Sequence, residues 1–194
     1  MSRTPSTMLP LGTPAPNFAL PDASSGRAVA LSEFDGQILL VAFVSNHCPY
    51  VKHILPGFVQ LAHEYLERGV AIVMISSNDA QVYPDDAPEQ MQVLARQMEL
   101  RVPYLFDETQ QVAREYHAAC TPDFFLFDEH HKLIYRGQMD AARKNNDLPV
   151  DGADLRAALD AALAGEPASI EQKPSLGCNI KWKPGNEPDY FSHG

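Results

Sequence analysis

The chain has 194 residues, of which 45% are hydrophobic and 21% are charged, and its formal net charge is −10. A chain of this length can bury one full hydrophobic core, so we expect a single domain with some length left for an extension. The acidic balance excludes a broad phosphate-binding surface, and nucleic acid is not an expected partner, because affinity for phosphates comes chiefly from lysine and arginine.

The first predicted elements are a strand, a helix and a second strand. Residues 37–45 (QILLVAFVS) are continuously apolar, which is typical of a strand buried on both faces. Residues 49–69 place apolar side chains on one helical stripe and end at Gly69. Residues 70–78 are a second apolar run of strand length. Two strands joined by one helix within about 40 residues indicate a βαβ unit with parallel strands.

Shorter elements are predicted after this unit. Asp86 and Glu89 form a capping-box pattern, which predicts that a helix begins at Asp86 and continues to about residue 98. The remaining expected elements are a strand at 102–107, a helix at 108–117, a hairpin at 124–137 and an amphipathic helix at 153–166.

The last segment, residues 166–194, has neither helical nor strand periodicity and is rich in proline and glycine. This composition predicts an irregular C-terminal tail. A fully solvated tail would hardly carry Trp182, Tyr190 and Phe191. We therefore expect at least part of the tail to pack against the domain formed by residues 1–165.

The chain contains three cysteines, Cys48, Cys120 and Cys178. They are an odd number and form no C-x-x-C pair, so a structural disulfide framework of the secreted kind is not expected. The sequence also contains no run of about 18 apolar residues and no signal-peptide pattern. We expect a cytoplasmic protein without membrane contact, in which any redox role of a cysteine is catalytic or sensing.

Cys48 lies where a buried strand passes into a helix, at the N-cap. Pro49 suits the first helical position because that N–H has no partner inside the helix. Free N–H groups and the positive end of the helix dipole favour an anion there, and they lower the pKa of a thiol. The side chains of His47, Lys52 and His53 could add positive charge. We therefore expect an exposed sulfur that is a thiolate at neutral pH and acts as a nucleophile.

No metal site is expected around this cysteine. A tetrahedral site needs two close ligand pairs, and His47, Cys48 and His53 do not provide them. No organic cofactor is implied by any other part of the sequence.

The chain resembles the thioredoxin-like superfamily, and specifically its redoxin branch, which includes the AhpC/TSA peroxiredoxins. Residues 11–43 are similar to the redoxin N-terminal segment, with G-x-x-A-P-x-F followed by L-S-x-F. The segment FVSNHCPYVKHILP matches the strand phenylalanine, first active-site cysteine, lysine and helix-kinking proline of thioredoxins. The matching residues are Phe43, Cys48, Lys52 and Pro56.

The segment CTPDFFLF is similar to the cis-proline loop that faces the active cysteine in that fold. Together with NHCPYVKH and PSLGCNIKWK, it resembles a peroxiredoxin-like group of bacterial thioredoxin-fold proteins. The resemblance covers about residues 9–165. It implies an α/β fold with a central mixed sheet flanked by helices and an N-terminal hairpin extension.

Several positions depart from the patterns of these families. Val51 stands where thioredoxins carry their second cysteine, so Cys48 cannot close the usual i, i+3 disulfide. Ala42 stands at the position of their buried acid. The peroxiredoxin pattern P-x-x-x-[T/S]-x-x-C can be aligned so that its cysteine is Cys48. Val41 then stands in place of the proline, and only Ser45 matches the pattern.

Disulfide exchange passes through a mixed disulfide that a second thiol must resolve. Cys120 lies on the loop that the resemblance places opposite Cys48. Cys178 lies in the tail, which is long enough to fold back. A small thiol such as glutathione is the third alternative. Cys48 is thus the expected nucleophile, with Cys120 and Cys178 as its candidate catalytic partners.

The resemblance also implies the substrate-binding residues. A cis peptide bond before Pro122 would shape a groove in which a substrate strand pairs with the backbone of Thr121. The residues expected to shape the site around the cysteine are His47, Pro49, Tyr50 and Lys52.

The expected function is thiol-disulfide exchange on protein or small-molecule disulfides, with glutathione or a thioredoxin system as the thiol electron donor. An alternative is a peroxidase with an antioxidant role, in which a hydroperoxide oxidises Cys48 to sulfenic acid. A further alternative is a redox sensor or binding module that has lost turnover. The sequence leaves the oligomeric state open, a homodimer included.

Overall fold

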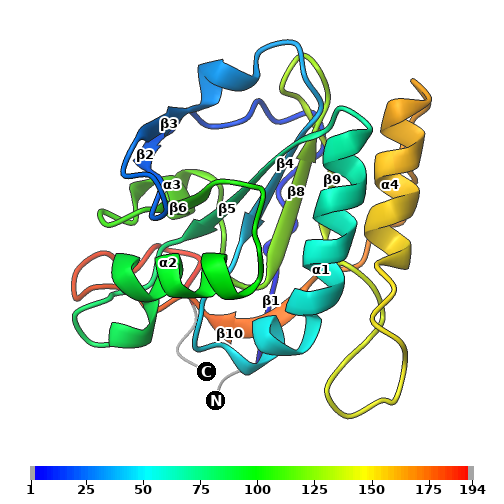
Figure 1. Ribbon diagram of the computed structural model, residues 1–194. Coiled ribbons are helices and arrows are strands. Elements are labelled where there is room, and N and C mark those ends of the chain that lie inside the picture. Colours follow the sequence, from blue (N-terminus) through cyan, green and yellow to red (C-terminus); the bar gives the residue numbers. More distant parts are fainter. Residues whose placement is uncertain (1–2, 192–194) are drawn as a thin grey trace.

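The fold is built around a five-stranded mixed sheet. The structure is a computed structural model and describes residues 3–191. The strand order is β6-β5-β4-β8-β9 (Figure 1). Strands β4, β5 and β6 are parallel, whereas β8 is antiparallel to both β4 and β9. The strands are β4 (Leu39–Phe43), β5 (Ala71–Ser76), β6 (Tyr104–Phe106), β8 (Asp123–Phe127) and β9 (Leu133–Gly137).

Each face of this sheet has its own hydrophobic core, because successive side chains of a strand point to opposite faces. In β4, Leu40 and Ala42 belong to one core, and Leu39, Val41 and Phe43 belong to the other. Helices α1, α2 and α4 cover the first core, while α3 and the β2–β3 hairpin cover the second. Within residues 3–191, no helix combines the length and apolarity needed to span a membrane. The helices are α1 (Pro49–Glu67), α2 (Pro88–Gln97), α3 (Gln111–Glu115) and α4 (Ala153–Leu163), with short 3-10 helices η1 (Leu31–Phe34) and η2 (Pro84–Asp86).

Most of the predicted elements are present in this architecture. The βαβ unit is β4–α1–β5, and the predicted hairpin is β8–β9. The N-terminal extension is a hairpin of β2 (Ala19–Pro21) and β3 (Ala28–Ala30). The predicted cap of α2 is wrong, because the N-cap residue is Ala87 and the Asp86 carboxylate binds a distant loop instead.

The C-terminal tail contains a strand that its composition did not predict. Strand β10 (Leu176–Asn179) pairs antiparallel with β7 (Cys120–Thr121) on one side and with β1 (Arg3–Pro5) on the other. Figure 1 shows β1 and β10 side by side. After β10, Ile180 is buried in the second core and Trp182 packs against it. The partners of β10 are far away in sequence, so local periodicity gave no signal for this strand.

Candidate active site

Cys48 lies at the N-cap of α1, in the loop that follows β4. Its backbone N–H donates to the hydroxyl group of Ser45 at 3.2 Å. The side chain is fully buried, so the prediction of an exposed sulfur is wrong. The physical reason is the C-terminal tail, since β10 lies against α1 and carries a residue that contacts the sulfur.

That residue is Cys178. In the ladder between β7 and β10, Cys178 stands directly opposite Thr121. The sulfur of Cys48 lies 3.1 Å from the carbonyl oxygen of Thr121. The Cys178 thiol is in hydrogen-bond contact with the Cys48 sulfur. The structure thus brings the tail cysteine next to the predicted nucleophile.

Gly177 allows β10 to approach so closely. A Cβ atom added at this position would lie 1.9 Å from the carbonyl oxygen of Thr121. That oxygen belongs to the backbone of β7, so a larger residue would have to push the two strands apart. Glycine inside a strand often marks such a close approach of another backbone, and the glycine of PSLGCNIKWK is a sequence signal of this kind.

The hydrogen bond from the Cys178 thiol is the largest influence on the Cys48 sulfur, and it helps to lower the pKa of Cys48 to about 5. Burial opposes this effect, whereas backbone N–H groups of Val51 and Cys178 reinforce it. The lowered pKa predicted for a helix N-terminus is therefore confirmed. Its main cause is a donor from the tail rather than the charges of His47 and Lys52.

The same contact raises the pKa of Cys178 above its ordinary value. At neutral pH the pair is therefore a Cys48 thiolate that accepts a hydrogen bond from a Cys178 thiol. A hydrogen bond to a charged acceptor is stronger than one between neutral groups. This favours the state in which Cys178 keeps its proton and Cys48 is ionised.

Cys120 is also fully buried, and burial raises the pKa of its thiol, with the charges of Asp123 and Cys48 adding to the effect. Side chains alternate along a strand, so Cys120 does not share the face on which Thr121 and Cys178 stand opposite each other. Its sulfur lies 3.7 Å from the carbonyl oxygen of Pro122. Within residues 3–191, no hydrogen bond joins Cys120 to Cys48.

Asp86 fixes the loop at the start of α1. Its buried carboxylate accepts hydrogen bonds from the backbone N–H groups of Asn46 at 2.7 Å and His47 at 3.2 Å. It also accepts one from the Asn78 side chain at 2.8 Å, and it lies 2.5 Å from Nδ1 of His47. Burial is the largest single influence and would raise the pKa of Asp86, but the bonds from His47 and Asn78 together lower it. Sequence reasoning missed this role, because Asp86 acts on a loop distant in sequence.

A second buried carboxyl group, Asp123, follows the cis-proline loop directly. The Thr121–Pro122 bond is cis, as the resemblance implied. Asp123 accepts a hydrogen bond from the Ser6 hydroxyl at 2.7 Å, and burial raises the pKa of Asp123 to about 8. A buried acid therefore follows the cis-proline loop, but it lies on β8 and not at the position of Ala42 on the neighbouring β4.

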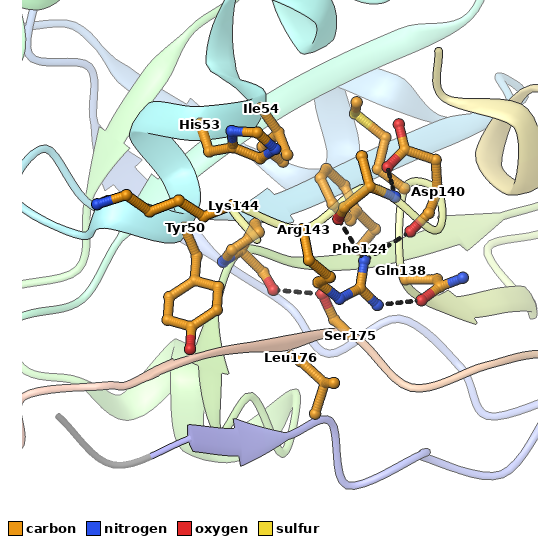
Figure 2. Close-up of a pocket in the computed structure, with 13 residues that line it drawn as sticks. Tyr50, His53, Ile54, Phe124, Gln138, Asp140, Arg143, Lys144, Ser175 and Leu176 are labelled. Carbon is orange, nitrogen blue, oxygen red and sulfur yellow. Dashed lines mark hydrogen bonds between the residues drawn. The ribbon is translucent and has the colours of Figure 1, made fainter. Parts of the chain in front are cut away.

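Two neighbouring cavities open beside the start of α1. The smaller one, of about 20 Å³, lies between α1, the cis-proline loop and the segment 138–144 (Figure 2). Tyr50 and Lys144 line both cavities. Pro49 lines the larger one, whereas Lys52 is exposed on α1 and lines neither. The larger cavity, of about 510 Å³, is lined by Arg3, Pro49, Tyr50, Lys144 and Asn145.

The mixed sheet, the cysteine at a helix N-terminus and the cis-proline loop define a thioredoxin-like protein. The fold is similar to that of a thiol:disulfide interchange protein of the thioredoxin family from Chlorobium tepidum TLS, with a TM-score of 0.61 and 18% identity. That similarity covers 78% of this chain and 97% of the other. Residues 11–136 match the AhpC/TSA family. This match spans more than half of the sequence, and the chain belongs to the AhpC/TSA family, which confirms the resemblance.

Other proteins are also similar to this chain. An uncharacterized conserved protein from Geobacillus kaustophilus has a crystal structure with a TM-score of 0.94 and 49% identity, covering 95% of this chain and 98% of that one. The thiol-disulfide oxidoreductase ResA of Halalkalibacterium halodurans is 26% identical over 123 residues. That match spans 63% of this chain and 65% of ResA, which is slightly less than two thirds of the relative's length.

Proposed function

We propose that this protein is a thiol-disulfide oxidoreductase in which Cys48 is the nucleophile and Cys178 is the resolving thiol. The observation that carries the proposal is that β10 places Cys178 opposite Thr121, whose carbonyl oxygen lies 3.1 Å from the buried Cys48 sulfur. The opposite pKa shifts of the two cysteines agree with direct contact between them. Membership of the AhpC/TSA family and similarity to ResA support an oxidoreductase.

The reaction follows from the protonation of the pair. The Cys48 thiolate attacks one sulfur of a disulfide RSSR, forms a mixed disulfide and releases RS⁻. The Cys178 thiol then gives its proton to this departing thiolate and attacks the Cys48 sulfur. A Cys48–Cys178 disulfide forms and the second RS⁻ leaves. The substrate gains two electrons and the protein loses two, and an external thiol from glutathione or a thioredoxin system would restore the reduced pair.

A neutral small disulfide tests this scheme. The reduced protein is mixed with bis(2-hydroxyethyl) disulfide, the released thiol is measured, and the cysteines are mapped by mass spectrometry. The wild-type protein should release two equivalents of thiol and form a Cys48–Cys178 bridge. Cys178→Ser should release one equivalent and retain a mixed disulfide at Cys48, and Cys48→Ser should release none.

Cys120→Ser is the matched control in this experiment, because Cys120 is equally buried but is not hydrogen-bonded to Cys48. It should form the same bridge as the wild-type protein. A bridge to Cys120, or two equivalents of thiol released by Cys178→Ser, would contradict the assignment of the resolving thiol. A bridge that forms without any turnover in the presence of a thiol donor would favour a redox sensor.

A hydroperoxidase is the second candidate, and membership of the AhpC/TSA family favours it. Ser45, the one residue that fits the peroxiredoxin pattern, accepts the backbone N–H of Cys48. In this reaction Cys48 would be oxidised to sulfenic acid and Cys178 would condense with it, releasing water. Stopped-flow oxidation with hydrogen peroxide separates the two candidates, since a rate no faster than that of free cysteine excludes the peroxidase.

A further inference from the structure

The backbone edge at which a peptide substrate would pair is already occupied. Thr121 pairs with Cys178 of the chain itself, and the opposite edge of β10 is paired with β1. An extended peptide binds a sheet by adding a strand to an open edge. Here it would first have to displace β10, whose contact with β7 leaves no room for even a Cβ atom at Gly177.

The open space beside Pro49, the residue that follows Cys48, is instead suited to a small molecule. The cavity of about 510 Å³ reaches Pro49, the residue next to the nucleophile. Sites for small molecules commonly measure about 300–1,000 Å³. The narrow cleft that shares Tyr50 and Lys144 with this cavity extends it to Pro122 of the cis-proline loop.

The charges around this space are positive, although the whole protein carries a formal net charge of −10. Arg3 and Lys144 line the cavity, no acidic residue does so among the described residues, and neither cation forms an ion pair within residues 3–191. In the adjoining cleft the carboxylate of Asp140 already accepts the N–H groups of Ala142 at 2.9 Å and Gly152 at 2.8 Å.

The adjoining cleft also contains a polar atom that lacks a partner. Nε2 of His53 is buried and makes no hydrogen bond within the described residues. Figure 2 shows His53 with Tyr50 and Lys144 at the same end of this cleft. A buried polar atom without a partner is costly, and a polar ligand group that widens this cleft on entry would provide the partner.

We infer that the disulfide substrate of this site is a small anionic molecule, bound through its carboxylate groups by Arg3 and Lys144, and not an extended peptide. This inference rests on the proposed function and specifies the substrate class of the same site. The pair of cations holds the ligand beside Pro49, at the N-terminus of α1. Cys48 is fully buried, so its attack on the disulfide requires a local opening of β10. A small disulfide needs a smaller opening than the displacement of the whole strand that an added peptide strand requires.

Four disulfides of different charge and size test the inference. The reduced protein is mixed in single turnover at low ionic strength with glutathione disulfide, bis(2-hydroxyethyl) disulfide, cystamine or insulin, and the rate of Cys48 oxidation is measured. Glutathione disulfide should react about tenfold faster than cationic cystamine. The net charge of the protein alone would favour cystamine, because it attracts cations over long range. Insulin should react most slowly.

Lys144→Gln should slow the reaction with glutathione disulfide about two- to fivefold, as expected for one exposed charge, and should slow the reaction with the neutral bis(2-hydroxyethyl) disulfide less. Arg3→Gln should act similarly. The matched control is Lys132→Gln, an exposed lysine in the turn between β8 and β9, which should change neither rate.

Faster oxidation by cystamine or insulin, or a Lys144→Gln variant that reacts like the wild-type protein, would overturn the inference and leave the proposed function standing. Failure of all four disulfides to oxidise Cys48 would overturn the proposed function itself.

Discussion

At the scale of single residues, the acidity of Cys48 depends on a donor from another part of the chain. The helix N-terminus is a local feature, and it predicted a thiolate at this position. In the structure, the hydrogen bond from the Cys178 thiol is the largest influence that lowers the pKa of Cys48. This hydrogen bond opposes burial, which raises the pKa. The sulfur can therefore be both buried and negatively charged.

Removing this donor should raise the pKa of Cys48. A hydrogen bond to a charged group contributes about 1.5–3 kcal/mol, and one pKa unit equals about 1.4 kcal/mol. Cys178→Ala should therefore shift the pKa of Cys48 upward by about one to two units from its value of about 5. The measurement is the rate of iodoacetamide alkylation against pH, fitted for its midpoint.

Cys178→Ser retains a hydroxyl donor, so its midpoint should lie between those of the wild-type protein and Cys178→Ala. Cys120→Ser should titrate like the wild-type protein. An unchanged midpoint in Cys178→Ala would show that the helix N-terminus alone sets the acidity.

At the scale of elements, β10 acts as a cover over the start of α1. Its place depends on Gly177, because any Cβ atom there collides with the carbonyl oxygen of Thr121. Gly177→Ala should destabilise the docked strand by about 1–3 kcal/mol. This corresponds to roughly 5- to 150-fold more of the open form, and alkylation of Cys48 should accelerate by a similar factor.

The alkylation rate should be measured at pH 9. At this pH Cys48 is almost fully ionised in both proteins, so a change in its pKa has little effect on the rate. Glu171→Ala is the control, because Glu171 lies in the same tail and its side chain is exposed. Equal alkylation rates for Gly177→Ala and the wild-type protein would show that β10 does not limit access.

The loop before α1 depends on a second element, since Asp86 lies in η2 and holds that loop through buried hydrogen bonds. Asp86→Ala leaves these donors without an acceptor, so we expect a loss of about 3 kcal/mol in the free energy of unfolding by urea. The adjacent Asp85 is exposed, and Asp85→Ala should change stability by no more than about 0.5 kcal/mol. Equal effects of the two substitutions would contradict the role of Asp86.

At the scale of the whole molecule, stability should depend on pH through Asp123. Its pKa is raised from 3.8 to about 8 by burial, so the folded protein binds more protons than the unfolded chain between these values. Stability contributed by this group therefore falls as the pH rises through that window. Asp123→Asn keeps an acceptor for the Ser6 hydroxyl but does not titrate.

Asp123→Asn should be more stable than the wild-type protein at pH 8, on the order of 2 kcal/mol, and the difference should shrink toward pH 4. Urea unfolding of the reduced proteins at several pH values measures this. The exposed Asp189 serves as control, since Asp189→Asn should give a pH-independent difference. A constant difference for Asp123→Asn would mean that this carboxyl group is ionised throughout the range.

The sequence predicted those features whose signal is local. The apolar runs at 37–45 and 70–78 indicated β4 and β5, and the cysteine before Pro49 indicated the N-cap. The pairing of β1 with β10 was not predictable, because neither segment has strand periodicity and each depends on the other for its hydrogen bonds. Which of Cys120 and Cys178 is the better candidate for the resolving thiol was also not predictable, because it depends on the register between β7 and β10.

The order in which the chain is synthesised gives the β10 cover a further consequence. Cys48 leaves the ribosome well before Cys178, so a nascent chain carries the nucleophile without its hydrogen-bond donor. During that interval the sulfur has only the acidity that the helix terminus provides. Docking of the last segment then buries the sulfur and supplies its hydrogen-bond donor in the same step.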